Sequence, residues 1–288
     1  MSLKYDFTFA EIAIQLLESG NSDYIKAISE TDAAKHIVNH ATYFSGYTGS
    51  AFELMSELLT TIEKESLHMI VRNIAFVREY IENKAVSVAM QFLPMETAFF
   101  GSIFFTCGYD IGVAFGENCS LNIAHPKFLS DMRELMYYAI HEIHHVGFIK
   151  CKGGAIPSLS ISTRGEMADL IAYLTHMEGM ATYAPYALRE QNNALNNDND
   201  YVILQNSSQL IEHMREYLDI FGHFDNARDK ILSEEDWQKL GVLSDVKRLW
   251  YIIGAHMART IDKRFGREHL LSLLYEPSKA FIAQATAE

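Results

Sequence analysis

Cysteine and proline are scarce in this chain of 288 residues, which has 3 cysteines and 5 prolines. An odd number of so few cysteines excludes the dense disulfide framework of a small secreted scaffold. A reducing compartment, the cytoplasm, is therefore the expected location. Few prolines leave room for long helices, because proline interrupts a helix wherever it falls inside one.

Basic residues are also in the minority, since 24 lysines and arginines stand against 37 aspartates and glutamates, giving a net charge of −13. Phosphate contacts need a basic surface, so this balance argues against a nucleic-acid partner. A run of about 18 apolar residues is missing, which argues against a membrane span. No apolar stretch follows Met1, so no secretory signal is expected. The hydrophobic content of 49% is enough for a large core.

The stretch His141-Glu142-Ile143-His144-His145 is the most informative part of the chain. Residues four apart lie on one face of a helix, so His141 and His145 can reach a single ion. Glu142 lies about 100° further round the helix, where it can touch a water molecule bound to that ion. Two imidazoles, such a water and a nearby carboxylate are the components of a zinc hydrolase.

The residues around this motif predict a helix from about residue 131 to residue 150, between Pro126 and the pair Gly153-Gly154. One arc of it is apolar and the opposite face carries both histidines. The apolar arc consists of Met132, Leu135, Met136, Ala139, Ile143 and Val146. The alternative to a metal site is a surface helix that happens to be rich in histidine.

A third ligand is required, because catalytic zinc usually takes three protein ligands. Glu178 extends an apolar stripe on a predicted helix over residues 164–190, and a carboxylate there should be paired or bound to metal. Its alternative role is an ion pair with a buried arginine. Cys151, at the eleventh position of the motif, is the other candidate ligand, but the preceding glycine comes one place early. Gly179 and Ala181 are small enough to let this helix pack closely against the histidine helix.

The motif His141-Glu142-x-x-His145, followed by Glu178-Gly-Met-Ala-Thr-Tyr183, resembles the gluzincin group of zinc metallopeptidases. It is similar in particular to a set of poorly characterised bacterial zinc-dependent peptidases. The similarity extends from about Gly101 to the C-terminus. It implies a zincin-like fold and Glu178 as the third ligand. It also implies a strand before the histidine helix whose free edge pairs with the substrate backbone.

Residues 101–108 and 119–124 have the alternation of strands and are the candidates for that role. A hairpin with only a structural role is the alternative. We therefore expect an α+β, mostly α-helical fold, with a small sheet packed against the motif helix and a helical C-terminal part. The expected division is a helical region over residues 1–100 and a zincin-like region over residues 101–288, which could form one continuous domain.

The expected function is a zinc-dependent hydrolase, most simply a peptidase acting on a peptide or protein substrate, with Glu142 as the general base. Tyr251, on a small-residue helix face, is the candidate donor to the oxyanion, followed by His256 and then His125. A core tyrosine is the alternative for Tyr251.

Two other functions stay open at this stage. One is a catalytically silent zincin-like binding module. The other is a helical di-iron-type metal protein, which would use the Glu-x-x-His spacing of Glu142 and His145. His36 and His40 share the spacing of the motif histidines but have no accompanying glutamate. The sequence carries no indication of the oligomeric state.

Overall fold

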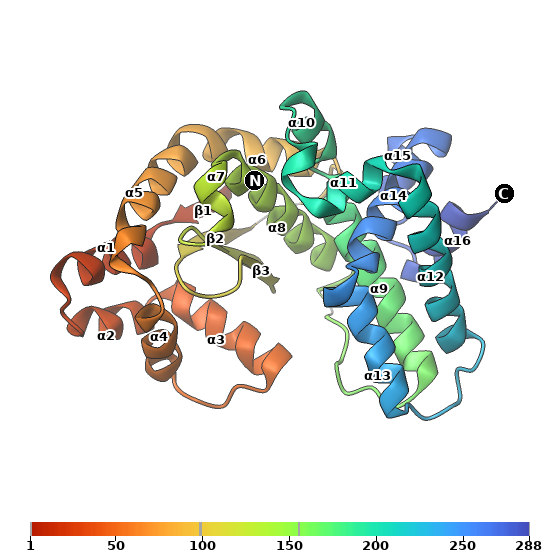
Figure 1. The fold of residues 1–288 in the computed structure, drawn as a ribbon, viewed down its shortest axis with the longest axis horizontal. Coiled ribbons are helices and arrows are strands. Elements are labelled where there is room, and N and C mark those ends of the chain that lie inside the picture. The colour runs from red at the N-terminus through yellow and green to blue at the C-terminus, as the bar shows by residue number, and fades with distance from the viewer. Residues whose placement is uncertain (1, 98–99, 155, 288) are drawn as a thin grey trace. The chain divides into compact units, whose positions relative to one another are not determined.

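The chain consists of two compact units in the computed structural model, which describes residues 2–97, 100–154 and 156–287. The first comprises Met1–Met90 and Met95–Lys150, and the second comprises Gln91–Pro94 and Cys151–Glu288. Helices dominate both units, and the one sheet described belongs to the first unit (Figure 1). The predicted α+β, mostly helical class is thus confirmed. The predicted division at residue 100 stays a prediction.

The sheet has four strands in the order β1-β2-β4-β3. These are β1 (Ser2–Asp6), β2 (Phe100–Thr106), β3 (Gly112–Phe115) and β4 (Asn118–Asn122). The first three strands in that order are parallel, whereas β3 is antiparallel to β4. The two strands predicted from the sequence correspond to β2 and β4, and both have strand neighbours on either side. The expectation that one of them offers a free edge is therefore wrong, and β1 and β3 are the two described strands with an open side.

Helices surround this sheet in the first unit. They are α1 (Thr8–Ser19), α2 (Asp23–Ser29), α3 (Asp32–Ser45), α4 (Ala51–Thr60), α5 (Leu67–Phe76), α6 (Glu82–Met90), α7 (Lys127–Ser130) and α8 (Arg133–Cys151). A π-helical turn over Val77–Ile81 joins α5 to α6. Helix α3 begins at Thr31, whose side chain accepts the amide of Ala34. Its buried face packs on β2, β3 and β4.

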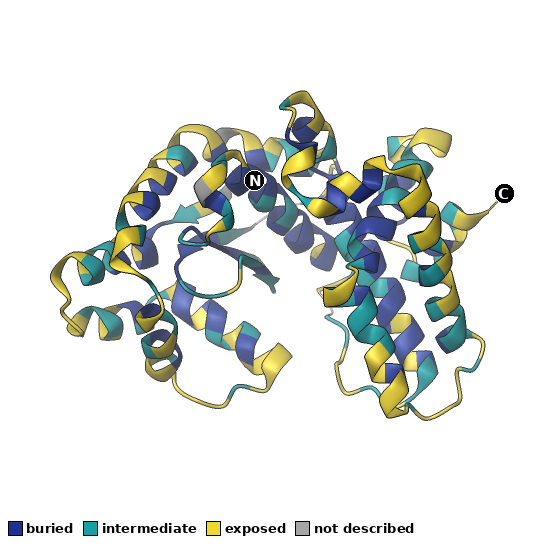
Figure 2. Ribbon diagram, viewed as in Figure 1, coloured by how far each residue is buried: buried dark blue, intermediate teal, exposed yellow. Residues whose placement is uncertain are grey.

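Helix α8 carries the motif and is buried on nearly all sides. Of its 19 residues 14 are buried, among them Glu142 and His145, and the helix is dark blue along most of its length in Figure 2. A histidine-rich surface helix is therefore the wrong reading of this segment. Burial of a helix that carries polar side chains indicates that those side chains have a defined role.

The second unit is helical in all its described regular elements apart from short turns and one bridge. It contains α9 (Arg164–Tyr183), α10 (Tyr186–Gln191), α11 (Asn199–Gln205), α12 (Ser207–Asp225), α13 (Glu234–Gly241), α14 (Leu249–Phe265), α15 (Arg267–Ser272) and α16 (Ser278–Thr286). A 3-10 turn over Leu195–Asn197 precedes α11, and a π-helical turn over Val242–Val246 follows α13. Helix α9 begins with a capping box, in which Thr163 and Glu166 each satisfy the other's backbone amide.

Helices α9 and α14 approach each other at a pair of glycines. A Cβ atom on Gly179 would lie 2.3 Å from the carbonyl carbon of Gly254, and one on Gly254 would lie 2.3 Å from the carbonyl oxygen of Thr175. The expectation that Gly179 serves the packing against the histidine helix is therefore wrong, because its missing side chain makes room for α14. The two backbones are in direct contact, and no larger residue fits at either position.

One local prediction also differs from the structure. The helix expected over 164–190 is interrupted between Tyr183 and Tyr186, where Pro185 precedes a new helix. Residues 191–200 hold a 3-10 turn and the start of α11. Helices α11 and α12 are separated at Asn206, whose side chain accepts a hydrogen bond from the backbone amide of Gln209 and so caps the start of α12.

Replacing Gly254 with alanine should destabilise the protein by about 1–3 kcal/mol, because the new methyl group meets backbone atoms that cannot turn aside. Thermal unfolding measures the effect. Gly241→Ala is the matched control, since a Cβ there meets nothing within 4 Å and the backbone is helical. It should be neutral or stabilising by up to about 1 kcal/mol. Equal losses in both variants would contradict the close approach of α9 and α14.

Candidate metal centre

His141 and His145 project from the same side of α8. Their ring centroids lie 4.4 Å apart with an interplanar angle of 86°. The i, i+4 spacing produces this juxtaposition, as the sequence predicted. His145 is buried and His141 is half-buried, so one ring nitrogen of each can be directed at a common point.

Tyr138 lies one turn before His141 on the same helix, and the two rings are 6.4 Å apart. The Lys127 ammonium group donates a hydrogen bond of 2.7 Å to the Tyr138 hydroxyl and lies 4.9 Å from the centre of its ring. The short helix α7 thereby places a positive charge beside the motif face. The sequence analysis did not single out Lys127, because its place beside Tyr138 depends on the turn between α7 and α8.

Glu142 is 4% exposed and is directed towards the sheet. A Cβ atom added to Gly112 would lie 2.7 Å from the Glu142 carboxylate oxygen, so the glutamate passes directly over the first residue of β3. Cys119 on β4 also interacts electrostatically with this carboxylate. Burial, and after it the charge of Glu142, raise the pKa of the Cys119 thiol well above its ordinary value. The carboxylate of the motif therefore lies against β3, one of the two outer strands of the sheet.

Glu178 projects from a part of α9 that is fixed on three sides. The Tyr217 hydroxyl donates to the Thr175 hydroxyl at 2.9 Å, and the Tyr201 hydroxyl donates to the Thr182 carbonyl at 2.8 Å. Gly179, the next residue, packs on α14. Because these contacts hold the helix one turn on either side, the Glu178 side chain starts from a well-defined backbone position.

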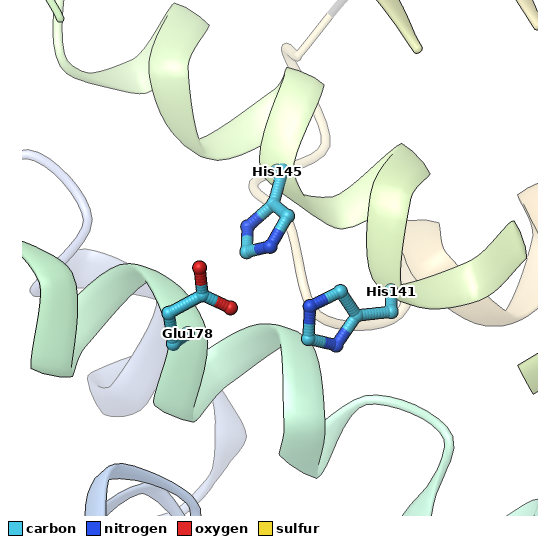
Figure 3. A group of neighbouring side chains, drawn as sticks. All are labelled: His141, His145 and Glu178. Atoms are coloured by element: carbon cyan, nitrogen blue, oxygen red, sulfur yellow. The ribbon is translucent and has the colours of Figure 1, made fainter. Parts of the chain in front are cut away.

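His141, His145 and Glu178 each contribute one ligand atom to a group in which these atoms all lie within 4.8 Å of one another. Figure 3 shows the Glu178 carboxylate pointing towards the two imidazole rings. Zinc bonds of about 2.0–2.2 Å would bring three such atoms to roughly 3–4 Å apart, so small side-chain rotations suffice for a common ion. Two imidazole nitrogens with one carboxylate oxygen suit zinc better than calcium or magnesium, which prefer oxygen alone.

The described residues thus contain a donor set typical of a mononuclear, catalytic zinc site, which leaves a position for water. A family model described as "Putative zinc dependent peptidase (DUF5700)" matches residues 15–284, and the chain belongs to this family. The resemblance to a poorly characterised family of zinc-dependent peptidases is thereby confirmed, and zinc is the cofactor that the family description names. No curated protein and no solved structure matches the chain. Among the described residues, no helix is both long and apolar enough to cross a membrane.

The other candidates lie elsewhere. Cys151 ends α8 and is not in the group of three ligand atoms. His36 and His40 lie on α3, where His40 Nδ1 is 3.1 Å from the Tyr109 hydroxyl, and the described residues show no metal-binding group that includes either histidine. A second Glu-x-x-His stretch, Glu65-Ser66-Leu67-His68, is present, but neither Glu65 nor His68 belongs to a metal-binding group among the described residues, as a di-iron centre would need.

Tyr251 is half-buried on α14, one turn before Gly254, and the Arg248 guanidinium lies 3.8 Å from the centre of its ring. His256 is half-buried on the same helix, and burial, with the charges of Arg259 and Lys263, lowers its pKa. Burial also lowers the pKa of His125, and Lys127 adds to the effect. No role of these three residues follows from their surroundings, and the choice of Tyr251 stays a prediction.

Strand β3 and Gly112 are the parts of the site that the sequence analysis missed. A signal was present, because Ile111, Val113 and Phe115 alternate with Gly112 and Ala114 as in a strand with one apolar face. The stretch was too short, and too close to Gly108 and Gly116, to stand out from a loop.

Proposed function

We propose that this protein is a zinc-dependent peptidase of the gluzincin type, in which His141, His145 and Glu178 hold the zinc ion. The observation that carries the proposal is the placement of Glu142, which follows His141 directly and lies against β3, an outer strand of the sheet. This arrangement provides a base beside the ion and a backbone edge for a substrate. The cytoplasm is the location we propose, on the small number of cysteines.

His141, His145 and Glu178 would hold the zinc ion, which when bound would lower the pKa of a bound water towards about 7 and polarise a carbonyl group. In the proposed reaction Glu142 accepts a proton from the attacking water and then donates it to the leaving amine. Tyr251 is the proposed hydrogen-bond donor to the oxyanion. The side chains of His141, His145 and Glu178 have no part in the proton transfer and only hold the ion.

Strand β3 is the proposed docking edge for the substrate backbone. The backbone N–H of Asn122 donates to the Ile111 carbonyl at 3.1 Å. Hydrogen-bonded residue pairs alternate with non-hydrogen-bonded pairs along an antiparallel ladder such as that of β3 and β4. The backbone groups of Gly112 and Ala114 therefore point away from β4, and no described strand pairs with them. A peptide in extended form can bind to these groups as an additional strand, which would draw its backbone past Glu142.

The direct test is cleavage of a randomised decapeptide library by zinc-loaded protein, with products identified by mass spectrometry. Cleavage that stops with a chelator and returns with zinc supports the proposal. A protein that binds zinc and cleaves none of these peptides would instead be a zincin-like binding module.

Replacing Gly112 with alanine should lower kcat by about 10- to 10²-fold while zinc content stays at the wild-type level. The new methyl group would lie 2.7 Å from a carboxylate oxygen of Glu142, so this flexible side chain must move away from its position. A displacement of about 1 Å at a reacting group can cost about 10²-fold in rate. Steady-state kinetics and metal analysis of the same preparation measure both quantities. An unchanged kcat would show that Gly112 has no role in positioning the Glu142 carboxylate for the reaction.

Replacing Tyr251 with phenylalanine should slow hydrolysis by about 10- to 10³-fold with little change in KM, because a donor to the developing oxyanion acts on kcat. The ring remains, so folding and zinc content should not change. If kcat is unaffected, Tyr251 is a core residue, and His256 and then His125 are the next positions to replace.

A further inference from the structure

An aromatic cluster covers the face of β3 opposite to Glu142. It consists of Tyr43 and Phe44 on α3 together with Phe115 on β3, the last residue of that strand. The ring centroids of Tyr43 and Phe44 are 5.0 Å apart, and they lie 5.6 and 6.3 Å from that of Phe115. All three residues belong to the first unit, as do β3 and α8.

Two of the three residues in this cluster are exposed to solvent. Tyr43 is 38% exposed and Phe44 is 42% exposed, while Phe115 is half-buried. His40 closes its inner side, with its ring 4.5 Å from Phe44 and 6.2 Å from Phe115. Burial lowers the pKa of His40 to about 4, so this wall is uncharged at neutral pH. The surface offered is therefore apolar and aromatic.

The position of the cluster relative to β3 determines which part of a bound peptide would meet it. Side chains alternate between the two faces of a strand, so Gly112 faces Glu142 while Phe115 faces α3. A residue paired directly opposite Phe115 would have its Cβ within about 5 Å of that of Phe115, on the same face. Phe115 is three positions from Gly112 in the strand. The corresponding distance along an extended peptide is roughly 10 Å.

We propose that Tyr43, Phe44 and Phe115 form a subsite that selects substrates with an aromatic or large aliphatic residue two to four positions from the cleaved bond. The inference rests on the proposed function, because it requires a peptide bound along β3. It assigns the substrate class: extended peptides with a bulky apolar side chain on one side of the bond.

The randomised decapeptide library tests the subsite in the complete zinc-loaded protein. Sequencing of the products should show phenylalanine, tyrosine, tryptophan or leucine enriched at one position, two to four residues from the cleaved bond. For a fixed peptide pair with phenylalanine or alanine at that position, kcat/KM should differ by about 10- to 100-fold. Tyr43→Ala and Phe115→Ala should each lower this ratio towards one.

Phe52→Ala is the matched control, because Phe52 is an aromatic residue of α4 in the same unit and is 48% exposed. It should leave the ratio unchanged. Tyr43→Ala keeps the experiment informative if Phe115→Ala fails to fold, since Tyr43 is an exposed helix residue. A ratio near one in the wild type, or one that survives both substitutions, would overturn the subsite even if hydrolysis is confirmed.

Affinity selection with the Glu142→Gln protein gives a second readout that does not depend on turnover. Peptides retained from the same library should be enriched in bulky apolar residues, and Tyr43→Ala in that background should remove the enrichment. If no peptide is cleaved by the wild type, the peptidase assignment fails while this selection still decides the subsite. Retention without any preference for apolar residues would overturn it.

Discussion

Glu142→Gln should keep zinc at the wild-type level and lower turnover by at least about 10²-fold, the usual scale for loss of a general base. Glutamine has nearly the same shape as glutamate, so the fit against Gly112 should survive. It cannot accept the proton of the attacking water, however. The measurement is kcat on a peptide from the library, together with the zinc content of the same sample.

Glu117→Gln is the control for this variant, because it makes the same change of charge at an exposed residue in the turn between β3 and β4. It should have wild-type kcat. Near-normal cleavage by Glu142→Gln would remove Glu142 from the mechanism, whatever the metal content.

Glu178→Ala should lose most of the bound zinc, because a site with three protein ligands is left with only His141 and His145. Activity at limiting zinc should fall with it. The control is Glu190→Ala, an exposed glutamate of α10 in the same unit, which should bind about one zinc per chain as the wild type does. Unchanged zinc content in Glu178→Ala would exclude this carboxylate as a ligand and make Cys151 the next candidate.

The helical part of the fold was largely predictable, because apolar periodicity and capping residues are local signals. Thr31 and Ser50, for example, both cap the starts of helices through their side chains. Strand β1 escaped prediction because Leu3 and Tyr5 acquire their role only by pairing with β2, about a hundred residues further along the chain. Pairing between distant segments leaves little trace in a stretch of five residues.

The grouping of the proposed metal ligands was predictable for a similar reason. The two histidines are one helical turn apart, and Glu178 interrupts an apolar stripe where a carboxylate is costly. The environment of Glu142 was not predictable, because Gly112 lies beside Glu142 only when β3 pairs with β4 in the antiparallel direction. The role of Gly179 was predicted wrongly, since a glycine in a helix shows that something approaches closely but not which helix does so.

Titration of zinc into the metal-free protein, with peptide cleavage followed at each step, tests the central claim most directly. We predict that activity is absent without zinc, rises in proportion to bound zinc and saturates at about one ion per chain. Full cleavage by protein from which all zinc has been removed would contradict the claim. So would a protein that is saturated with one zinc and cleaves no peptide.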